Sequence, residues 1–186
     1  MQFSEQDIKE LCPKVKDIKG FTDSLNLAFK QAEINNPLRV AAALARWKHE
    51  SWDFQRMREV WTGSPQQLKY DPTSGSNVSK LLGNTKPGDG IKFLGRGISQ
   101  ITGRYNYAAY SKYAGFDFLT YPEKLEQFPH AILSASWFWA TKKLNPIADR
   151  GDIVKIVKII NGGDMGLQDT INNYKKYLEW FKSKGF

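Results

Sequence analysis

The sequence predicts a mainly α-helical, single-domain fold with a minor β element. In most segments apolar residues recur every three or four positions, which is the period of an amphipathic helix. Strand-like alternation is confined to residues 98–102. The length of 186 residues fits one domain at the usual size of about 150 residues. A domain of this size can fold around its own core without disulfides.

Three helices are expected in the N-terminal part of the chain. Residues 4–13 combine a capping-box pattern with a short apolar stripe that a proline ends. Residues 21–32 carry apolar side chains at helical spacing. Asn36 and Pro37 then supply an N-cap side chain and the fixed backbone of a first helical position. The helix that follows is apolar on nearly every side, so we expect it to run through the centre of the domain and to carry residues 46–50 there.

The middle of the chain is expected to be less regular. Residues 62–92 are rich in glycine, proline, serine and asparagine, and they predict a long loop that could form a cleft wall. Residues 93–102 hold two glycines around Arg96 and then the strand-like alternation, which predicts the minor β element.

Helices are expected again in the second half of the chain. Helical spacing covers residues 108–113, 129–139 and 167–181. The run 153–160 is apolar enough for a strand or a buried helix, and we favour a helix. The last helix carries lysines on the face opposite its apolar stripe, namely Lys175, Lys176 and Lys182.

The chain is basic and rich in aromatic residues. Its 27 lysines and arginines exceed its 19 acidic residues, and the net charge of +8 favours anionic partners such as nucleic acid, lipid head groups or acidic cell-wall polymers. Aromatic residues make up 13% of the chain, which suits a ring-rich core or a cleft that stacks flat ligands. The core is the simpler interpretation. The polar N-terminus predicts no signal peptide, and no apolar run is long enough for a transmembrane helix.

The residue types exclude several kinds of enzyme site. Cys12 is the only cysteine, and His49 and His130 are the only histidines, which rules out zinc sites built from several thiolates or three histidines. The sequence contains neither a nucleophile elbow nor a P-loop, and residues 95–100 stop short of a dinucleotide fingerprint. We therefore expect no metal site and no nucleotide cofactor.

Glu50 is the first candidate for chemistry. It lies at the end of the apolar helix beside Trp47 and Phe54, where burial would raise the pKa of a carboxyl group. A glutamic acid that stays protonated near neutral pH can donate a proton to a glycosidic oxygen. The alternative is an ordinary ion pair with Arg46 one helical turn earlier, and the sequence favours the two interpretations equally.

Glu59 is the second candidate, and its spacing from Glu50 sets a condition. On an unbroken helix, nine residues would separate the two glutamates by about 13.5 Å and place them on opposite faces. Inverting glycosidases need carboxyl groups about 6.5–9.5 Å apart with room for a water. The pair can therefore act together only if the helix ends near Phe54 and the chain turns back. Taken alone, Glu59 is more simply a surface glutamate paired with an arginine.

Polar side chains follow the glycines around Arg96. Ser99, Gln100, Thr102 and Asn106 could present hydroxyl and amide groups to a groove, where such groups bind sugars or position a water. Residues 161–163, Asn-Gly-Gly, predict a helix C-cap.

Taken in order, the chain's motifs resemble those of glycoside hydrolase family 19, and within it the phage and prophage endolysins. The match runs from about residue 8 to residue 174. It rests on His-Glu-Ser at 49–51, Glu-Val-Trp at 59–61, and residues 83–90, 93–97, 100–107 and 160–163. Arg46, Trp47 and Lys48 depart from the smaller or neutral residues expected before the His-Glu-Ser motif.

The resemblance implies a lysozyme-like, two-lobed helical domain with a substrate cleft, covering residues 1–186 without a separate wall-binding domain. It also implies hydrolysis of β-1,4 linkages in polymers that contain GlcNAc, with inversion and without a cofactor. By position, Glu50 matches the general acid, Glu59 the base that activates water, and Thr102 the residue that helps hold that water. The matching sugar contacts are Gln100, Tyr105, Asn106 and Asn161.

Plant chitinases of the family carry several disulfides and a longer gap between the glutamates. The single cysteine and the nine-residue gap follow the endolysin pattern, so we expect peptidoglycan glycan strands, and bacterial lysis, rather than chitin. A chitinase on the same fold is the first alternative. A non-catalytic wall-binding protein is the second, and the intact set of Glu50, Glu59 and Thr102 argues against it. A nucleic-acid binder would leave the spacing of the carboxylates unexplained.

Partners and location follow from the same interpretation. We expect a monomer that binds peptidoglycan and no nucleic acid. The basic C-terminal helix, residues 167–184, could touch an anionic membrane weakly, although a solvated helix face is the simpler reading. The protein would be made in the host bacterial cytoplasm and act at the periplasmic wall after release.

Overall fold

Helix α3 (Pro37–Glu50) is the central element of the computed structural model, which describes residues 1–186. The Asn36 side chain accepts a hydrogen bond from the Arg39 backbone N–H at 2.9 Å, and Pro37 occupies the first helical turn. Every residue from Val40 to Trp47 is buried. The prediction that this helix runs through the centre of the fold is confirmed.

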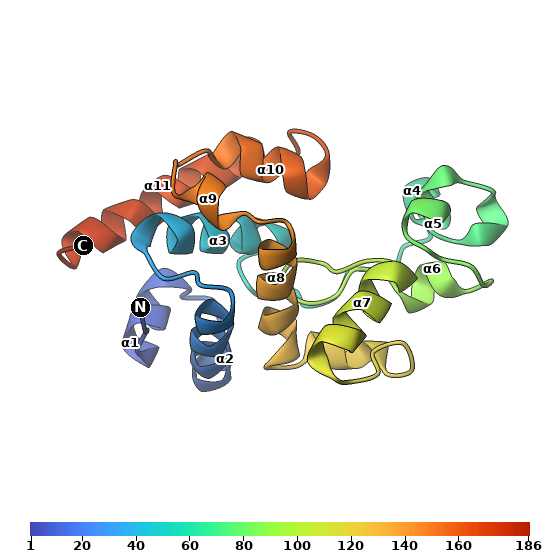
Figure 1. Ribbon diagram of the computed structural model, residues 1–186, viewed down its shortest axis with the longest axis horizontal. Helices are drawn as coiled ribbons and strands as arrows, with labels where there is room; N and C mark the ends of the chain where they lie inside the picture. Colours follow the sequence, from blue (N-terminus) through green and yellow to red (C-terminus); the bar gives the residue numbers. More distant parts are fainter.

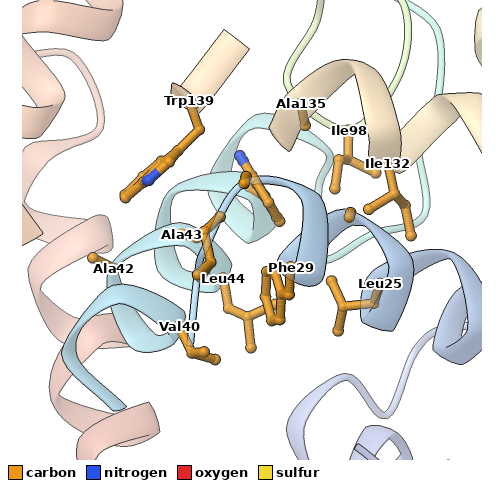
Figure 2. Packing of buried hydrophobic residues seen from close by; sticks show 14 of the residues in the cluster. Leu25, Phe29, Val40, Ala42, Ala43, Leu44, Ile98, Ile132, Ala135 and Trp139 are labelled. Atoms are coloured by element: carbon orange, nitrogen blue, oxygen red, sulfur yellow. The ribbon is translucent and has the colours of Figure 1, made fainter. Parts of the chain in front are cut away.

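Three helices pack around α3. Helix α11 (Leu167–Ser183) lies along it, and α2 (Ile18–Gln31) packs against α8 (His130–Thr141) beside it. Figure 2 shows Leu25 and Phe29 of α2 close to Leu44 of α3 in this core. Aromatic rings join the layers: Trp47 stacks on Phe29 with ring centroids 5.8 Å apart and meets Trp139 edge-on at 6.3 Å. These aromatic residues therefore belong to the core, as the simpler interpretation of the aromatic content predicted.

The other predicted helices are also present. They are α1 (Glu5–Leu11), which begins with the Ser4–Asp7 capping box, α7 (Arg104–Ala114) and α10 (Ile153–Asn161). The run 153–160 is thus a helix, as favoured. Two short segments, η2 (Pro122–Glu126) and α9 (Asn145–Ala148), flank α8. None of the helices combines the length and the apolar character that a bilayer crossing requires.

Residues 62–92 are not the long loop that the sequence predicted. They form four short helical segments: α4 (Pro65–Leu68), η1 (Pro72–Ser74), α5 (Asn77–Leu81) and α6 (Asp89–Lys92). The serines and the aspartate that suggested a loop act as N-caps of the first three, and the prolines open two of them. In Figure 1 these segments form, with α7, a lobe set apart from the helices around α3.

A buried ion pair fixes this smaller lobe. The Asp89 side chain is 3% exposed and accepts hydrogen bonds from Arg104 Nε at 2.8 Å and from the Thr85 backbone N–H at 2.8 Å. Arg104 also donates from Nη2 at 2.5 Å, which makes the pair bidentate. Burial alone would raise the pKa of Asp89, but the hydrogen bonds from Arg104 and the backbone outweigh it and lower the pKa to about 2.

Replacing Asp89 with asparagine is expected to lower the free energy of unfolding by about 3 kcal/mol at neutral pH, because it breaks a buried charge pair. The folded-state pKa of about 2 lies below the ordinary value near 4. The stabilisation is therefore complete above about pH 4 and is lost as the pH falls towards 2. Urea unfolding of both proteins across this range measures the effect. A difference between them that does not shrink at low pH would contradict this assignment.

The predicted β element is smaller than a strand. Residues 97–100 form a tight turn, and the ladder contacts beside it are two isolated bridges, from Arg96 to Ile101 and from Arg96 to Arg58. Gly97 and Gln100 both have left-handed backbone, with φ of 72° and 53°, so the chain reverses before a strand can extend. The alternation in the sequence thus marks a turn.

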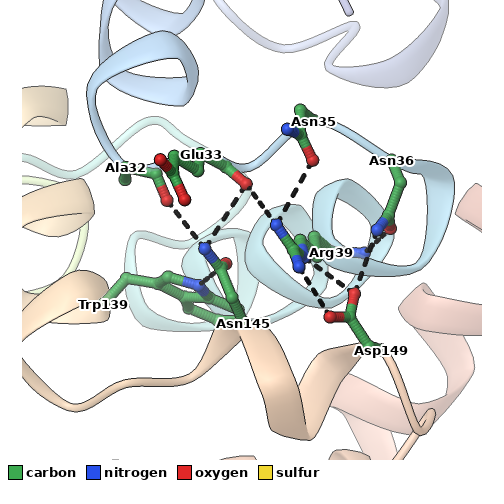
Figure 3. A network of polar contacts seen from close by, with 8 residues as sticks. All are labelled: Ala32, Glu33, Asn35, Asn36, Arg39, Trp139, Asn145 and Asp149. Atoms are coloured by element: carbon green, nitrogen blue, oxygen red, sulfur yellow. Dashed lines mark hydrogen bonds and ion pairs between the residues drawn. The ribbon is translucent and has the colours of Figure 1, made fainter.

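A second polar network ties the start of α3 to α9. Asp149 accepts hydrogen bonds from Arg39 Nε at 2.7 Å and from Asn36 Nδ2 at 3.0 Å (Figure 3). Hydrogen bonds from Arg39 and Asn36 lower the pKa of Asp149 to about 2. Asn145 accepts from Trp139 Nε1 at 2.8 Å and donates to the Ala32 carbonyl at 2.8 Å. These contacts hold the N-terminal end of α3 in place.

Candidate active site

Helix α3 ends at Glu50, and a left-handed turn follows it. Trp52, Asp53 and Phe54 have φ of 51°, 64° and 62°. Such a conformation costs about 1–2 kcal/mol for each non-glycine residue, so the surrounding contacts must hold the turn. The buried Ser51 hydroxyl does part of this, since it donates to the Trp47 carbonyl at 2.7 Å and accepts from the Phe54 N–H at 3.1 Å.

Two further contacts hold the turn. The Phe54 ring is buried and meets Phe21 edge-on, with centroids 5.3 Å apart. Asp53 pairs with Lys14 at 2.8 Å and with Lys48 at 3.0 Å. The helix therefore ends four residues before Phe54 and the chain reverses there, which meets the condition that the nine-residue spacing set.

Glu59 is held by amide groups. Its Oε1 accepts a hydrogen bond from Gln67 Nε2 at 2.9 Å, and its Oε2 accepts from the Gly95 backbone N–H at 3.1 Å. Burial and the negative charge of Glu59 raise the pKa of the neighbouring Tyr70 hydroxyl. The simpler reading, a glutamate paired with an arginine, is wrong. The two donors fix the carboxylate and leave each oxygen free to accept a further hydrogen bond.

Glu50 has apolar neighbours, as predicted, since it lines a small pocket with Trp47, Phe138 and Ile160, but it also contacts a charged side chain. Its side chain is 21% exposed and forms an ion pair with Arg46, whose side chain is 1% exposed. Burial lowers the pKa of Arg46 to about 10, so the guanidinium remains charged at neutral pH. Arg46 also donates to Asn161 Oδ1 at 2.8 Å, while its Nε has no hydrogen-bond partner. The alternative contact, with Arg46, is thus the one that forms.

The two glutamates line one cavity of about 520 Å³ between the lobes. The large lobe contributes Glu50 and Asn161, and the chain between α3 and α7 contributes Glu59 and the turn around Gln100. Three more residues that the sequence analysis placed at a groove also line the cavity: Ser99, Thr102 and Asn106. A hollow of about 570 Å³ near Met1 is slightly larger but contains a single carboxylate, Glu33.

The polar groups of the cavity are fixed by their own hydrogen bonds. Thr102 Oγ1 donates to the Gln100 carbonyl at 2.8 Å, which leaves the hydroxyl oxygen free to accept from a water. Gln100 Nε2 donates to the Gly97 carbonyl and Asn106 Nδ2 to the Thr102 carbonyl, both at 2.8 Å. Their side-chain oxygens remain as acceptors for sugar hydroxyls.

The structure does not bring every predicted residue into the cavity. The Tyr105 side chain is 69% exposed and does not line it. Conversely, two residues were missed because they lie in the segment interpreted as a loop: Gln67, which donates a hydrogen bond to Glu59, and Tyr70, which lines the cavity beside it. The Ser64–Pro65 pair is a helix-start signal and could have placed Gln67 on a helix.

Comparison with known proteins decides the family. No family model matches the chain. A protein of Haemophilus influenzae, described as a glycosyl hydrolase family 19 domain-containing protein, is 30% identical in an alignment of 200 positions that covers 96% of this chain and 96% of its own. The chain belongs to glycosyl hydrolase family 19. It is therefore a glycoside hydrolase, and the family resemblance of its motifs is confirmed.

Several chitinases are similar to this chain over part of their length or in fold. An endochitinase of Arabidopsis thaliana is 31% identical over 148 residues, and this chain spans 46% of it. Chitinase C of Streptomyces griseus has the same fold, with a TM-score of 0.73 at 20% identity over 95% of this chain and 90% of its own. The class IV chitinase of Zea mays gives 0.66 at 20% identity, over 95% and 90% of the two chains. The expected mainly helical, lysozyme-like fold is confirmed.

Proposed function

We propose that this family 19 protein hydrolyses the β-1,4 bonds of peptidoglycan glycan strands with inversion, with Glu50 as acid and Glu59 as base. One observation carries the proposal: two carboxylates in unlike environments line a single cavity. Arg46 contacts Glu50, whereas amide N–H groups hold Glu59. The cavity also supplies hydroxyl and amide oxygens for N-acetyl sugars.

Glu59, Thr102, Glu50 and Arg46 each have one role in this mechanism. Glu59 takes a proton from a water that Thr102 helps hold, and the water oxygen attacks the anomeric carbon. Glu50, which pairs with Arg46 in the free protein, must first take up a proton; it then gives this proton to the glycosidic oxygen as the bond from that oxygen to the anomeric carbon breaks. Glu50 thereby becomes a carboxylate, and the Arg46 guanidinium stabilises this new charge. Attack from the opposite face inverts the anomeric centre.

The preference for peptidoglycan rests on charge and on the sequence pattern. A net charge of +8 raises the local concentration of an anionic wall polymer. The single cysteine and the nine-residue gap follow the endolysin pattern, in which a monomer made in the host cytoplasm lyses the cell from the periplasmic side of the wall. The exposed lysines of α11, Lys175, Lys176 and Lys182, could add weak contact with an anionic membrane.

A chitinase is the second candidate, and the endochitinases among the relatives favour it. Digestion of isolated sacculi and of chitin oligomers, side by side, distinguishes the two. The proposal predicts new reducing ends and no new free amines from sacculi, at a higher kcat/KM than for chitin oligomers. Cleavage of chitin oligomers without release from sacculi would replace the proposal with the chitinase.

A further inference from the structure

A second hollow lies beside the cleft, at the C-terminal turn of α3. It has a volume of about 380 Å³, and its lining is polar and charged apart from one tryptophan ring. The side chains that matter here are Lys14, Lys48, His49, Trp52, Asp53 and Asp169. The mechanism proposed above uses none of them.

The hollow shares its wall with the cleft. His49 lines the hollow and the next residue, Glu50, lines the cleft. On the facing segment, Met165 lines the cleft and the next residue, Gly166, lies against the His49 imidazole. A Cβ at Gly166 would overlap this ring. A peptide on a glycan bound at Glu50 would have to run around the end of α3, not through this contact, to enter the hollow, and each extended residue of such a peptide spans about 3.3–3.6 Å.

The charged groups of the hollow are fixed in place. His49 Nδ1 and Asp169 Oδ2 are 2.7 Å apart, and Asp53 pairs with both Lys14 and Lys48. Lys14 and Asp169 each remain more than half exposed, so both can still meet a ligand. The hollow thus presents ammonium and carboxylate groups of both signs within one small space.

Trp52 is the least expected residue of the hollow. Its side chain is 66% exposed, its backbone is left-handed, and the Arg56 guanidinium lies 3.9 Å from its ring centroid. The ring therefore contributes little to the core, although its backbone conformation is costly. The exposed ring, held on a turn that its neighbours fix, is available to stack on a bound ligand.

We infer that this hollow binds the peptide attached to the glycan strand of peptidoglycan, and so selects peptide-bearing strands over chitin. The inference rests on the proposed function. Such a peptide carries carboxylates, which Lys14 can meet, and amino groups, which Asp169 can meet. The Trp52 ring covers the apolar part of the ligand. Chitin has no charged substituent for the hollow to bind.

Titration calorimetry with two soluble fragments tests the inference. One is a GlcNAc-MurNAc disaccharide that carries its peptide, and the other is the same disaccharide without the peptide. Wild type is expected to bind the peptide-bearing fragment about tenfold more tightly. Trp52→Asn and Lys14→Ala should each remove most of this preference and leave binding of the bare disaccharide unchanged. Asparagine tolerates a left-handed backbone, so Trp52→Asn should keep the wild-type Tm.

The matched control is Tyr121→Ala, which removes another exposed aromatic ring and should retain the full preference. Equal affinities in wild type, or no binding of the peptide-bearing fragment at millimolar concentration, would overturn the inference. Digestion of sacculi is measured separately. If the protein cleaves sacculi but shows no preference for the peptide-bearing fragment, the inference is wrong and the proposed activity stands. If it shows the preference but does not cleave sacculi, the inference is supported and the proposed activity is wrong.

Discussion

Replacing Glu50 with glutamine is expected to lower kcat on peptidoglycan about 10³-fold, because an amide has no acidic proton for the leaving glycosidic oxygen. The same change is expected to lower the free energy of unfolding by about 3 kcal/mol. Arg46, with its side chain 1% exposed, would lose its counter-charge. Release of reducing ends from sacculi and urea unfolding measure the two effects.

The Arg46→Met, Glu50→Gln double variant separates these two roles of Glu50. Methionine fills part of the same space without a charge, so the double variant should regain most of the lost stability. Its kcat should stay at the level of Glu50→Gln alone. A double variant that is no more stable than the single one would show that the ion pair is not the source of the loss. Wild-type kcat in Glu50→Gln would exclude Glu50 as the acid.

Replacing Glu59 with glutamine is expected to lower kcat by about 10²- to 10⁴-fold with little change in KM, because the water loses its base. A smaller loss of stability, about 1–2 kcal/mol, should accompany it. The new amide must turn an N–H group towards either Gln67 Nε2 or the Gly95 N–H, and both of these are donors.

Glu179→Gln is the matched control, since it removes an exposed carboxylate from α11 and should leave kcat unchanged. Initial rates on a soluble glycan fragment measure kcat and KM for the three proteins. A kcat for Glu59→Gln within about threefold of wild type would mean that another group activates the water.

The long helices were predictable from the sequence because each repeats its apolar period several times. Helix α2, for example, buries Phe21, Leu25 and Phe29, which are four residues apart. The segments α4 to α6 were not predictable in this way, because four or five residues span little more than one turn and show no period. Their capping residues were visible but are equally typical of turns.

The sequence predicted which residues form the candidate site better than it predicted what surrounds each of them. The Glu50–Glu59 spacing required the chain to reverse direction. The turn at Trp52, Asp53 and Phe54 provides this reversal through a left-handed backbone, which no pattern in the sequence predicts. Glu50 has the expected apolar neighbours, among them Trp47, but Arg46, one turn earlier, also reaches it. Side-chain direction decides this, and helical spacing allowed either outcome.

The stereochemistry of the first product tests the two-carboxylate account most directly. Proton NMR of the anomeric region during digestion of soluble β-1,4-linked glycan fragments resolves the two anomers before they equilibrate. The account predicts that the α-anomer forms first, because Glu59 directs water to the face opposite the leaving group. Initial accumulation of the β-anomer would mean retention of configuration and would contradict the role of Glu59 as the base.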